Sequence, residues 1–133
     1  MKTLSKLLFA TLLFLSMQPA SAAELGARSS SAAGVTVKVT PKDISPQAAV
    51  WTFAVVLDTH SQDLRDDLAK TSALVDARGG RHAPLAWDGA APGGHHRAGV
   101  LRFKGLGAQS GVLELQIRRV GEQTPRVFRW TLE

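Results

Sequence analysis

Apolar and polar residues alternate with a period of two along most of the chain, and this pattern predicts half-buried β-strands. Residues 35–40 show it first, because three valines alternate there with polar side chains. Residues 50–58 are apolar on both faces, which is typical of a strand in the middle of a sheet. Further strands are predicted at residues 72–77, 81–87, 99–103, 112–118 and 126–132.

Seven short strands at this spacing predict an all-β fold, an immunoglobulin-like antiparallel β-sandwich, with a small Greek-key barrel as the alternative. The chain has no cysteine, so only the architecture of immunoglobulin domains is inferred, and the apolar core alone must stabilise the fold. The large side chains on the inward-facing positions are expected to form that core: Trp51, Phe53, Leu57, Leu101, Phe103, Leu113, Leu115, Ile117, Phe128 and Trp130.

Helical periodicity is confined to residues 61–70, where Leu64 and Leu68 lie four residues apart. A helix of one or two turns is therefore predicted after the strand at residues 50–58, with Ser61 as its N-cap. The acidic residues of this segment are expected to form a solvated helix face, because the segment lacks the glycine and the closing glutamate of an EF-hand loop. They are Asp63, Asp66 and Asp67.

The N-terminus has the features of a cleavable signal peptide: two lysines, the apolar run Leu7–Leu15 and the small residues of Ala20–Ala22. A membrane-spanning helix needs about 20 apolar residues, so we expect an exported product, periplasmic or secreted, that is soluble and has no membrane span after processing. The predicted organisation is a signal peptide at residues 1–22, a flexible leader at 23–33 and the β-domain at 34–133.

The net charge of the chain does not point to a particular class of partner. Removal of Lys2 and Lys6 with the signal peptide lowers the net charge from +5 to +3, which is too small to indicate nucleic-acid binding. The basic residues of the C-terminal third are expected to form a solvated strand face: Arg97, Arg102, Lys104, Arg118, Arg119, Arg126 and Arg129.

Four stretches of the sequence, LDTHSQDL, PLAWDG, PGGHHRAGVLRF and VFRWTLE, resemble a group of short exported bacterial β-sandwich domains that have no assigned activity. The resemblance covers about residues 50–133 and is most specific at GGHHR, residues 93–97. It implies an exported β-domain and carries over no catalytic or binding residue.

No catalytic motif is present in the sequence. It contains neither cysteine nor tyrosine, and it lacks the G-x-S-x-G, H-E-x-x-H and P-loop patterns. Ser61 follows His60, but neighbouring side chains on extended chain point in opposite directions, which is unsuitable for a catalytic pair. We therefore expect no enzymatic activity.

The histidines are the one unusual feature. If successive strands run antiparallel, three histidines and two carboxylates gather at one end of the sandwich, whereas His82 lies at the other end. Imidazole and carboxylate groups suit Zn²⁺ or Cu²⁺, and Gly93 and Gly94 would allow a tight turn. The alternative is structural, with the histidines packed on Trp87 or bound to backbone carbonyls. The candidate metal ligands are His60, His95, His96, Asp58 and Asp88.

The leading prediction is a non-enzymatic exported binding or docking module. It would use the loops around residues 58–62 and 88–98, for a protein partner that the sequence does not identify. The alternative prediction is a periplasmic Cu- or Zn-binding protein that uses His60, His95 and His96.

Overall fold

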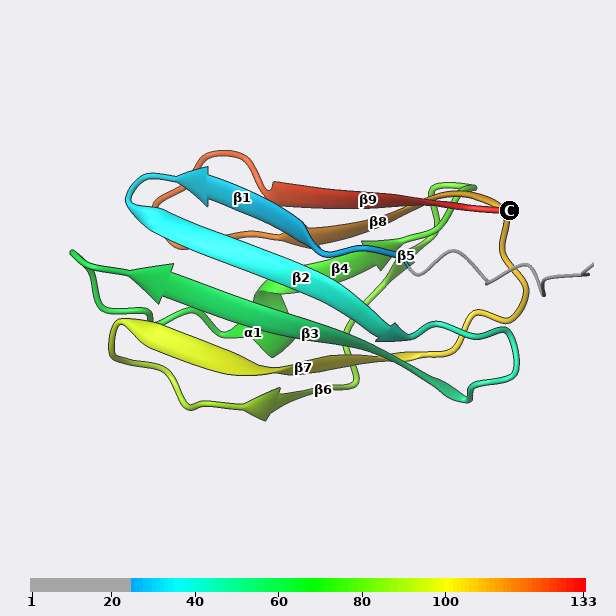
Figure 1. Cartoon of the computed structure of the whole chain (residues 1–133), viewed down its shortest axis with the longest axis horizontal. Coiled ribbons are helices and arrows are strands. Elements are labelled where there is room, and N and C mark those ends of the chain that lie inside the picture. Colours follow the sequence, from blue (N-terminus) through cyan, green and yellow to red (C-terminus); the bar gives the residue numbers. More distant parts are fainter. Residues whose placement is uncertain (1–24) are drawn as a thin grey trace, which may run out of the picture.

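The computed structural model describes residues 25–133, so the predicted signal peptide lies outside the described residues. These residues form nine strands and one short helix in two packed antiparallel sheets (Figure 1). The strand order is β1-β2-β3-β7-β6 in the larger sheet and β5-β4-β8-β9 in the smaller sheet. The elements are β1 (Arg28–Ala32), β2 (Val35–Asp43), β3 (Val50–Thr59), α1 (Leu68–Thr71), β4 (Ser72–Val75), β5 (Arg81–His82), β6 (Ala86–Gly89), β7 (His96–Lys104), β8 (Gly111–Ile117) and β9 (Arg126–Leu132).

The strand order confirms the immunoglobulin-like sandwich. If β2 to β9 are named A, B, C, C′, D, E, F and G in chain order, the sheets read A-B-E-D and C′-C-F-G. The strand predicted at residues 81–87 is divided into β5 and β6, because the chain passes from the smaller to the larger sheet between them. The other additional strand is β1, which precedes strand A.

Strand β1 contradicts the prediction of a flexible leader at residues 23–33. It pairs antiparallel with β2, from Arg28 opposite Val39 to Ala32 opposite Val35. Ala33 and Gly34 form the two-residue turn between these strands with φ angles of 48° and 75°, values that suit a tight hairpin turn. Residues 28–32 show no apolar period because most side chains of β1 face solvent and the pairing is made by the backbone.

The predicted core is confirmed, since each of its ten residues has at most 2% of its surface exposed. Phe53 lies at its centre, with its ring centroid 5.8 Å from that of Phe103 and 5.7 Å from that of Trp130. These contacts join β3 and β7 of the larger sheet to β9 of the smaller sheet. As predicted, β3 is an interior strand, between β2 and β7.

Helix α1 is shorter than the predicted segment and has a different N-cap. It has four residues, and the cap is Asp67, whose carboxylate accepts a hydrogen bond from the Lys70 backbone N–H at 3.3 Å. Leu64 and Leu68 are both buried, as expected. The backbone of Leu64 is hydrogen-bonded to Gly93 and Gly94, which takes the preceding residues out of the helix. Nowhere in residues 25–133 is there a helix with the length and apolar character that crossing a membrane requires.

Candidate functional site

The candidate site is the loop end, which we define as the end of the sandwich formed by residues 59–66 and 90–96. The two loops are joined by backbone and side-chain hydrogen bonds rather than by apolar packing. Gly93 and Gly94 have φ angles of 119° and 77°, so both need the conformational freedom of glycine. The hydrogen bonds run from Thr59 N to His95 O (2.9 Å), Leu64 N to Gly94 O (2.9 Å), Gly93 N to Leu64 O (2.7 Å) and Gly94 N to Asp63 Oδ1 (2.6 Å).

Three of the four histidines are exposed at the loop end, where the sequence predicted them. His96 at the start of β7 lies opposite Asp58 near the end of β3, and its Nδ1 is 2.5 Å from Asp58 Oδ1. The two side chains form a cross-strand pair on the outer face of the larger sheet, with 64% and 56% of their surfaces exposed. His82 lies apart from them, in β5, with its Nε2 2.9 Å from Asp76 Oδ2.

The five predicted metal ligands do not come together. Asp88 lies away from the loop end, in β6 opposite Val100, and pairs with Arg102 at 3.2 Å. Asp58 is engaged by His96 instead. Among the residues that the structure describes, no group of three or more His, Cys, Asp or Glu side chains could hold a metal ion.

The alternative interpretation placed histidines on Trp87, but an arginine lies there. The Arg97 guanidinium is 5.7 Å from the centroid of the Trp87 ring, in cation–π geometry. Arg97 also donates to Ala90 O at 3.1 Å and to Asp66 O at 2.7 Å. Its side chain therefore connects β7 to both loops of the loop end.

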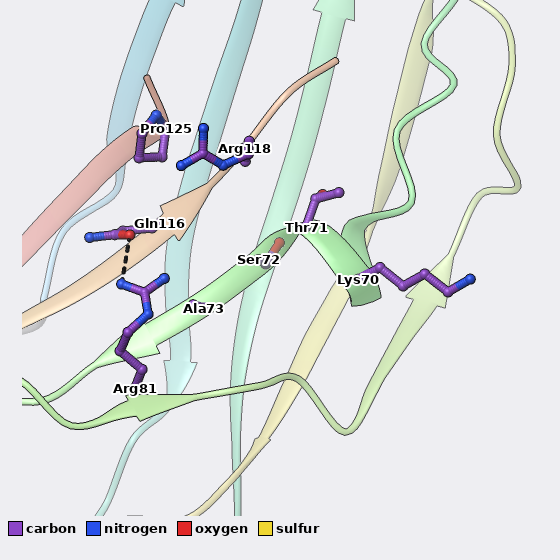
Figure 2. A pocket seen from close by; sticks show the side chains of 8 residues that line it. All are labelled: Lys70, Thr71, Ser72, Ala73, Arg81, Gln116, Arg118 and Pro125. Carbon is purple, nitrogen blue, oxygen red and sulfur yellow. Dashed lines mark hydrogen bonds between the residues drawn. The ribbon is translucent and has the colours of Figure 1, made fainter. Parts of the chain in front are cut away.

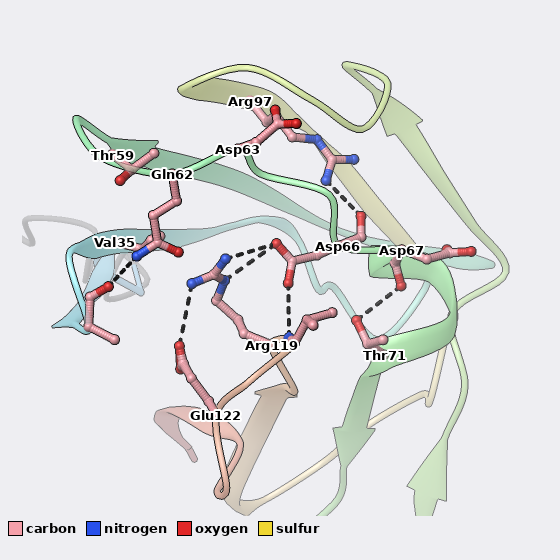
Figure 3. A network of polar contacts seen from close by, with 12 residues as sticks. Val35, Thr59, Gln62, Asp63, Asp66, Asp67, Thr71, Arg97, Arg119 and Glu122 are labelled. Atoms are coloured by element: carbon pink, nitrogen blue, oxygen red, sulfur yellow. Dashed lines mark hydrogen bonds and ion pairs between the residues drawn. The ribbon is translucent and has the colours of Figure 1, made fainter.

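A buried charge network lies beneath the loop end (Figure 3). Its residues were expected to be solvated, and that expectation is wrong: Asp66 and Arg97 are 1% exposed, and Arg119 and Arg126 are 5% exposed. Asp66 Oδ2 is 3.1 Å from Arg119 Nη2, and Asp66 Oδ1 accepts a hydrogen bond from Val120 N at 3.3 Å. The other two aspartates of the acidic segment, Asp63 and Asp67, are exposed as expected.

The network continues from Arg119 through Glu122 to Arg126. Glu122 carboxylate oxygens lie 3.4 Å from Arg119 Nη1 and 2.6 Å from Arg126 Nε. The hydrogen bond from Arg126 lowers the pKa of Glu122 below its usual value, with smaller contributions from the charges of both arginines, while burial opposes the shift. Arg126 also donates to the carbonyl oxygens of the β1–β2 hairpin, at Ser30 (2.8 Å), Ala32 (2.8 Å) and Val35 (3.1 Å).

The alternation contains a signal for the buried arginines that the sequence interpretation missed. Arg119 has the same parity as Leu115 and Ile117, which face the core. Arg126 has the parity of Phe128, and Arg97 has that of Leu101. Each arginine thus occupies an inward-facing position where a strand meets the loop end. A charged side chain at such a position is buried, and it therefore needs a hydrogen-bonded or charged partner.

The loop end is consequently a rigid and polar surface. The cavities that lie away from it include an apolar one of about 390 Å³ bordered by Leu25, Trp51 and Leu132, and one of about 290 Å³ beside Asp76. A basic cavity of about 220 Å³ lies on the outer face of the smaller sheet. An arrangement of hydrogen-bonded loops with exposed polar side chains and a buried support can recognise a surface.

No protein-family model matches the chain, and no curated protein matches it. Among solved structures, a DUF4426 family protein from Pseudomonas aeruginosa is similar, with 13% sequence identity and a TM-score of 0.49. The match covers 81% of this chain and 94% of that chain. It carries no argument about function, and the resemblance to exported domains that contain GGHHR stays a prediction.

Proposed function

We propose that the protein is a non-enzymatic docking module that binds a protein partner through the loop end. The observation that supports this is the pair of loops held in one arrangement by the buried charge network. Asp66 is central to it, because its backbone carbonyl holds Arg97 and its carboxylate holds Arg119.

Stability alone does not account for such a network. Removing charges from water costs several kcal/mol per ion, and apolar side chains of similar volume often stabilise a core equally well or better. A buried network does, however, restrict the chain to one arrangement. For the loop end this means that Gly93, Gly94 and His95 stay close to Thr59 and Leu64 without a partner.

A rigid surface binds with a smaller entropic cost, because fewer side chains and loops become ordered in the complex. The exposed residues at the loop end are mixed in chemistry, with imidazole, carboxylate, guanidinium and hydroxyl groups. They suit the polar surface of a protein better than an apolar ligand. The exposed polar side chains are those of His60, Ser61, Asp63, Arg65, His95 and His96, with Asp58 beside them at the end of β3.

Export is part of this proposal. The basic residues, the apolar run and the small residues of the first 22 positions support it. Mass spectrometry of the protein recovered from the cell envelope should give a mature N-terminus at or next to Ala23. Recovery of envelope protein that still begins with Met1 would contradict this part of the proposal without affecting the docking surface.

The docking proposal is tested by site-specific photocrosslinking in cells that express the full chain. A crosslinker at His60 or His95 should capture one protein of defined size, and the same crosslinker at Lys38 should not. Lys38 is the matched control because it is exposed on β2, outside the loop end. The purified partner should then bind the wild type and lose affinity for a His60→Glu, His95→Glu variant.

Two results would refute docking at the loop end. One is an identical crosslinking pattern from His60, His95 and Lys38. The other is undiminished binding of the purified partner by the double variant. The alternative of Cu or Zn binding is less well supported, because Asp58 and Asp88 are engaged by His96 and Arg102.

A further inference from the structure

The outer face of the smaller sheet carries a basic cavity of about 220 Å³. It lies between α1, the start of β4, the end of β8 and the chain before β9 (Figure 2). Three of its eight lining residues are cationic and none is acidic. The lining residues are Lys70, Thr71, Ser72, Ala73, Arg81, Gln116, Arg118 and Pro125.

The cavity exists because a small residue lies between large ones. Ala73 of β4 is opposite Gln116 of β8, and its methyl group leaves the space between Arg81 and Arg118 open. In Figure 2 the two arginines extend on different sides of Gln116, and Lys70 extends from α1 at the margin.

The two arginines are positioned, but they are not neutralised. Arg81 Nη1 donates to Gln116 Oε1 at 3.1 Å, and Arg118 Nη1 donates to Gln123 O at 3.4 Å. The Arg118 backbone N–H donates to Thr71 O at 2.9 Å, which holds the residue beside the helix. Among the described residues neither guanidinium forms a salt bridge, so most of their N–H donors are available to a ligand.

The neighbouring carboxylates contact two other lining residues, Gln116 and Lys70, and neither of the two arginines. Glu114 Oε1 accepts from Arg129 at 2.8 Å, and Glu114 Oε2 accepts from Gln116 at 2.5 Å. Asp67 caps α1 and lies 3.7 Å from Lys70 Nζ. Asp67 thus offsets part of the charge of Lys70, and the positive potential of the cavity comes from Arg81 and Arg118.

We propose that this cavity binds a phosphate group, carried by a small compound or by a lipid headgroup. The two N–H donors of an arginine guanidinium match two phosphate oxygens. A phosphomonoester carries about −1.5 to −2 charges at neutral pH, so two arginines neutralise it, whereas a carboxylate needs only one. The volume exceeds that of a few water molecules of about 30 Å³ each. It is smaller than the roughly 300–1,000 Å³ of pockets that enclose whole drug-sized ligands, so the carrier of the phosphate extends into solvent.

The first test is calorimetric titration of the mature protein with inorganic phosphate and with glycerol phosphate, at constant ionic strength. Saturable binding is expected, with Kd raised about tenfold or more by Arg81→Ala and by Arg118→Ala, because each removes a charge-assisted contact. Lys38→Ala, an equal change of charge on the larger sheet, should leave Kd unchanged. The Ala73→Leu variant keeps every charge and fills the cavity, and it should also lose binding.

The second test separates the two sources of phosphate. Vesicles of phosphatidylcholine with phosphatidic acid should sediment the protein, in competition with inorganic phosphate, if the headgroup is the ligand. Phosphate binding without vesicle binding assigns a soluble compound. The proposal is overturned if the wild type shows no saturable phosphate binding, if Lys38→Ala weakens binding as much as the arginine variants, or if Ala73→Leu binds normally.

Discussion

The Arg119 guanidinium lies 3.1 Å from the Asp66 carboxylate, and both side chains are almost completely removed from solvent between the two sheets. Fifty-three positions separate them in the sequence. Their ion pair connects the segment before α1 to the turn between β8 and β9. Because Asp66 also binds Arg97 through its carbonyl, it supports both loops of the docking surface.

Asp66→Ala is expected to lower the free energy of unfolding by about 3–5 kcal/mol, because it leaves Arg119 charged and buried with only the more distant Glu122 carboxylate as a partner. That is a large part of the ~5–15 kcal/mol typical of a domain. Urea unfolding followed by circular dichroism measures the change. Asp88→Ala is the control, since its pair with Arg102 is exposed and should contribute less than about 1 kcal/mol. Equal losses in the two variants would mean that the buried pair has no special role.

The acid limb of the stability curve should depend on Glu122. Its pKa is lowered in the folded protein by the hydrogen bond from Arg126, so its contribution is complete above the unfolded value of about 4.3. That contribution is lost as the pH falls through the folded pKa. Urea midpoints measured from pH 7 to pH 3 should therefore fall less steeply for Glu122→Gln than for the wild type. Parallel curves would exclude Glu122 from the acid transition.

Deletion of residues 23–32 should destabilise the domain by at least about 2 kcal/mol, because Arg126 loses buried hydrogen-bond acceptors at Ser30 and Ala32. Differential scanning calorimetry of the truncated and mature proteins measures the difference. A flexible leader would instead leave the melting temperature unchanged.

Phe53→Ala should cost about 3–5 kcal/mol, as large-to-small changes in a packed core do. The side chain is fully buried, and its loss leaves a cavity between Phe103 and Trp130. The variant should be marginally stable or unfolded at 37 °C. A melting temperature within a degree or two of the wild type would contradict the described packing of β3.

Zn²⁺ and Cu²⁺ should produce no rise in melting temperature that depends on the loop-end histidines, because only His96 and Asp58 meet and no set of three ligands is assembled among the described residues. The measurement uses protein without a histidine tag, with and without each metal. A shift lost in His60→Ala and in His95→Ala but kept in His82→Ala would restore the metal interpretation.

The larger part of the fold could be predicted because its strands are half-buried and therefore alternate. Val35 to Val39 and Leu113 to Ile117 carry that signal directly. Strand β1 could not be found in this way, because its serines face solvent and its pairing is made by the backbone.

The loop end was predicted only in part. Antiparallel succession of strands places His60, His95 and His96 at one end, and this was correct. Which side chains meet there depends on loop conformation, which has no period. Asp66 lies between Leu64 and Leu68. Its burial was hidden because the segment was interpreted as a solvated helix face, whereas residues 63–67 are not helical and α1 begins only at Leu68.

The contacts of β9 with β1 and with Gly26, just before β1, join segments that lie far apart in the sequence. Trp130 Nε1 donates to Gly26 O at 2.8 Å across 104 positions, and Arg28 Nε donates to Arg129 O at 3.1 Å across 101 positions. In Figure 1 the two strands run beside each other at one edge of the sandwich. The contacts of β1 with β9 therefore cannot form until the residues of β9 have been synthesised. Folding that is dominated by such distant contacts takes milliseconds to seconds. A nascent chain that still lacks β9 cannot form these contacts, and the export proposed above requires such an incompletely folded state if it uses a translocase for unfolded polypeptides.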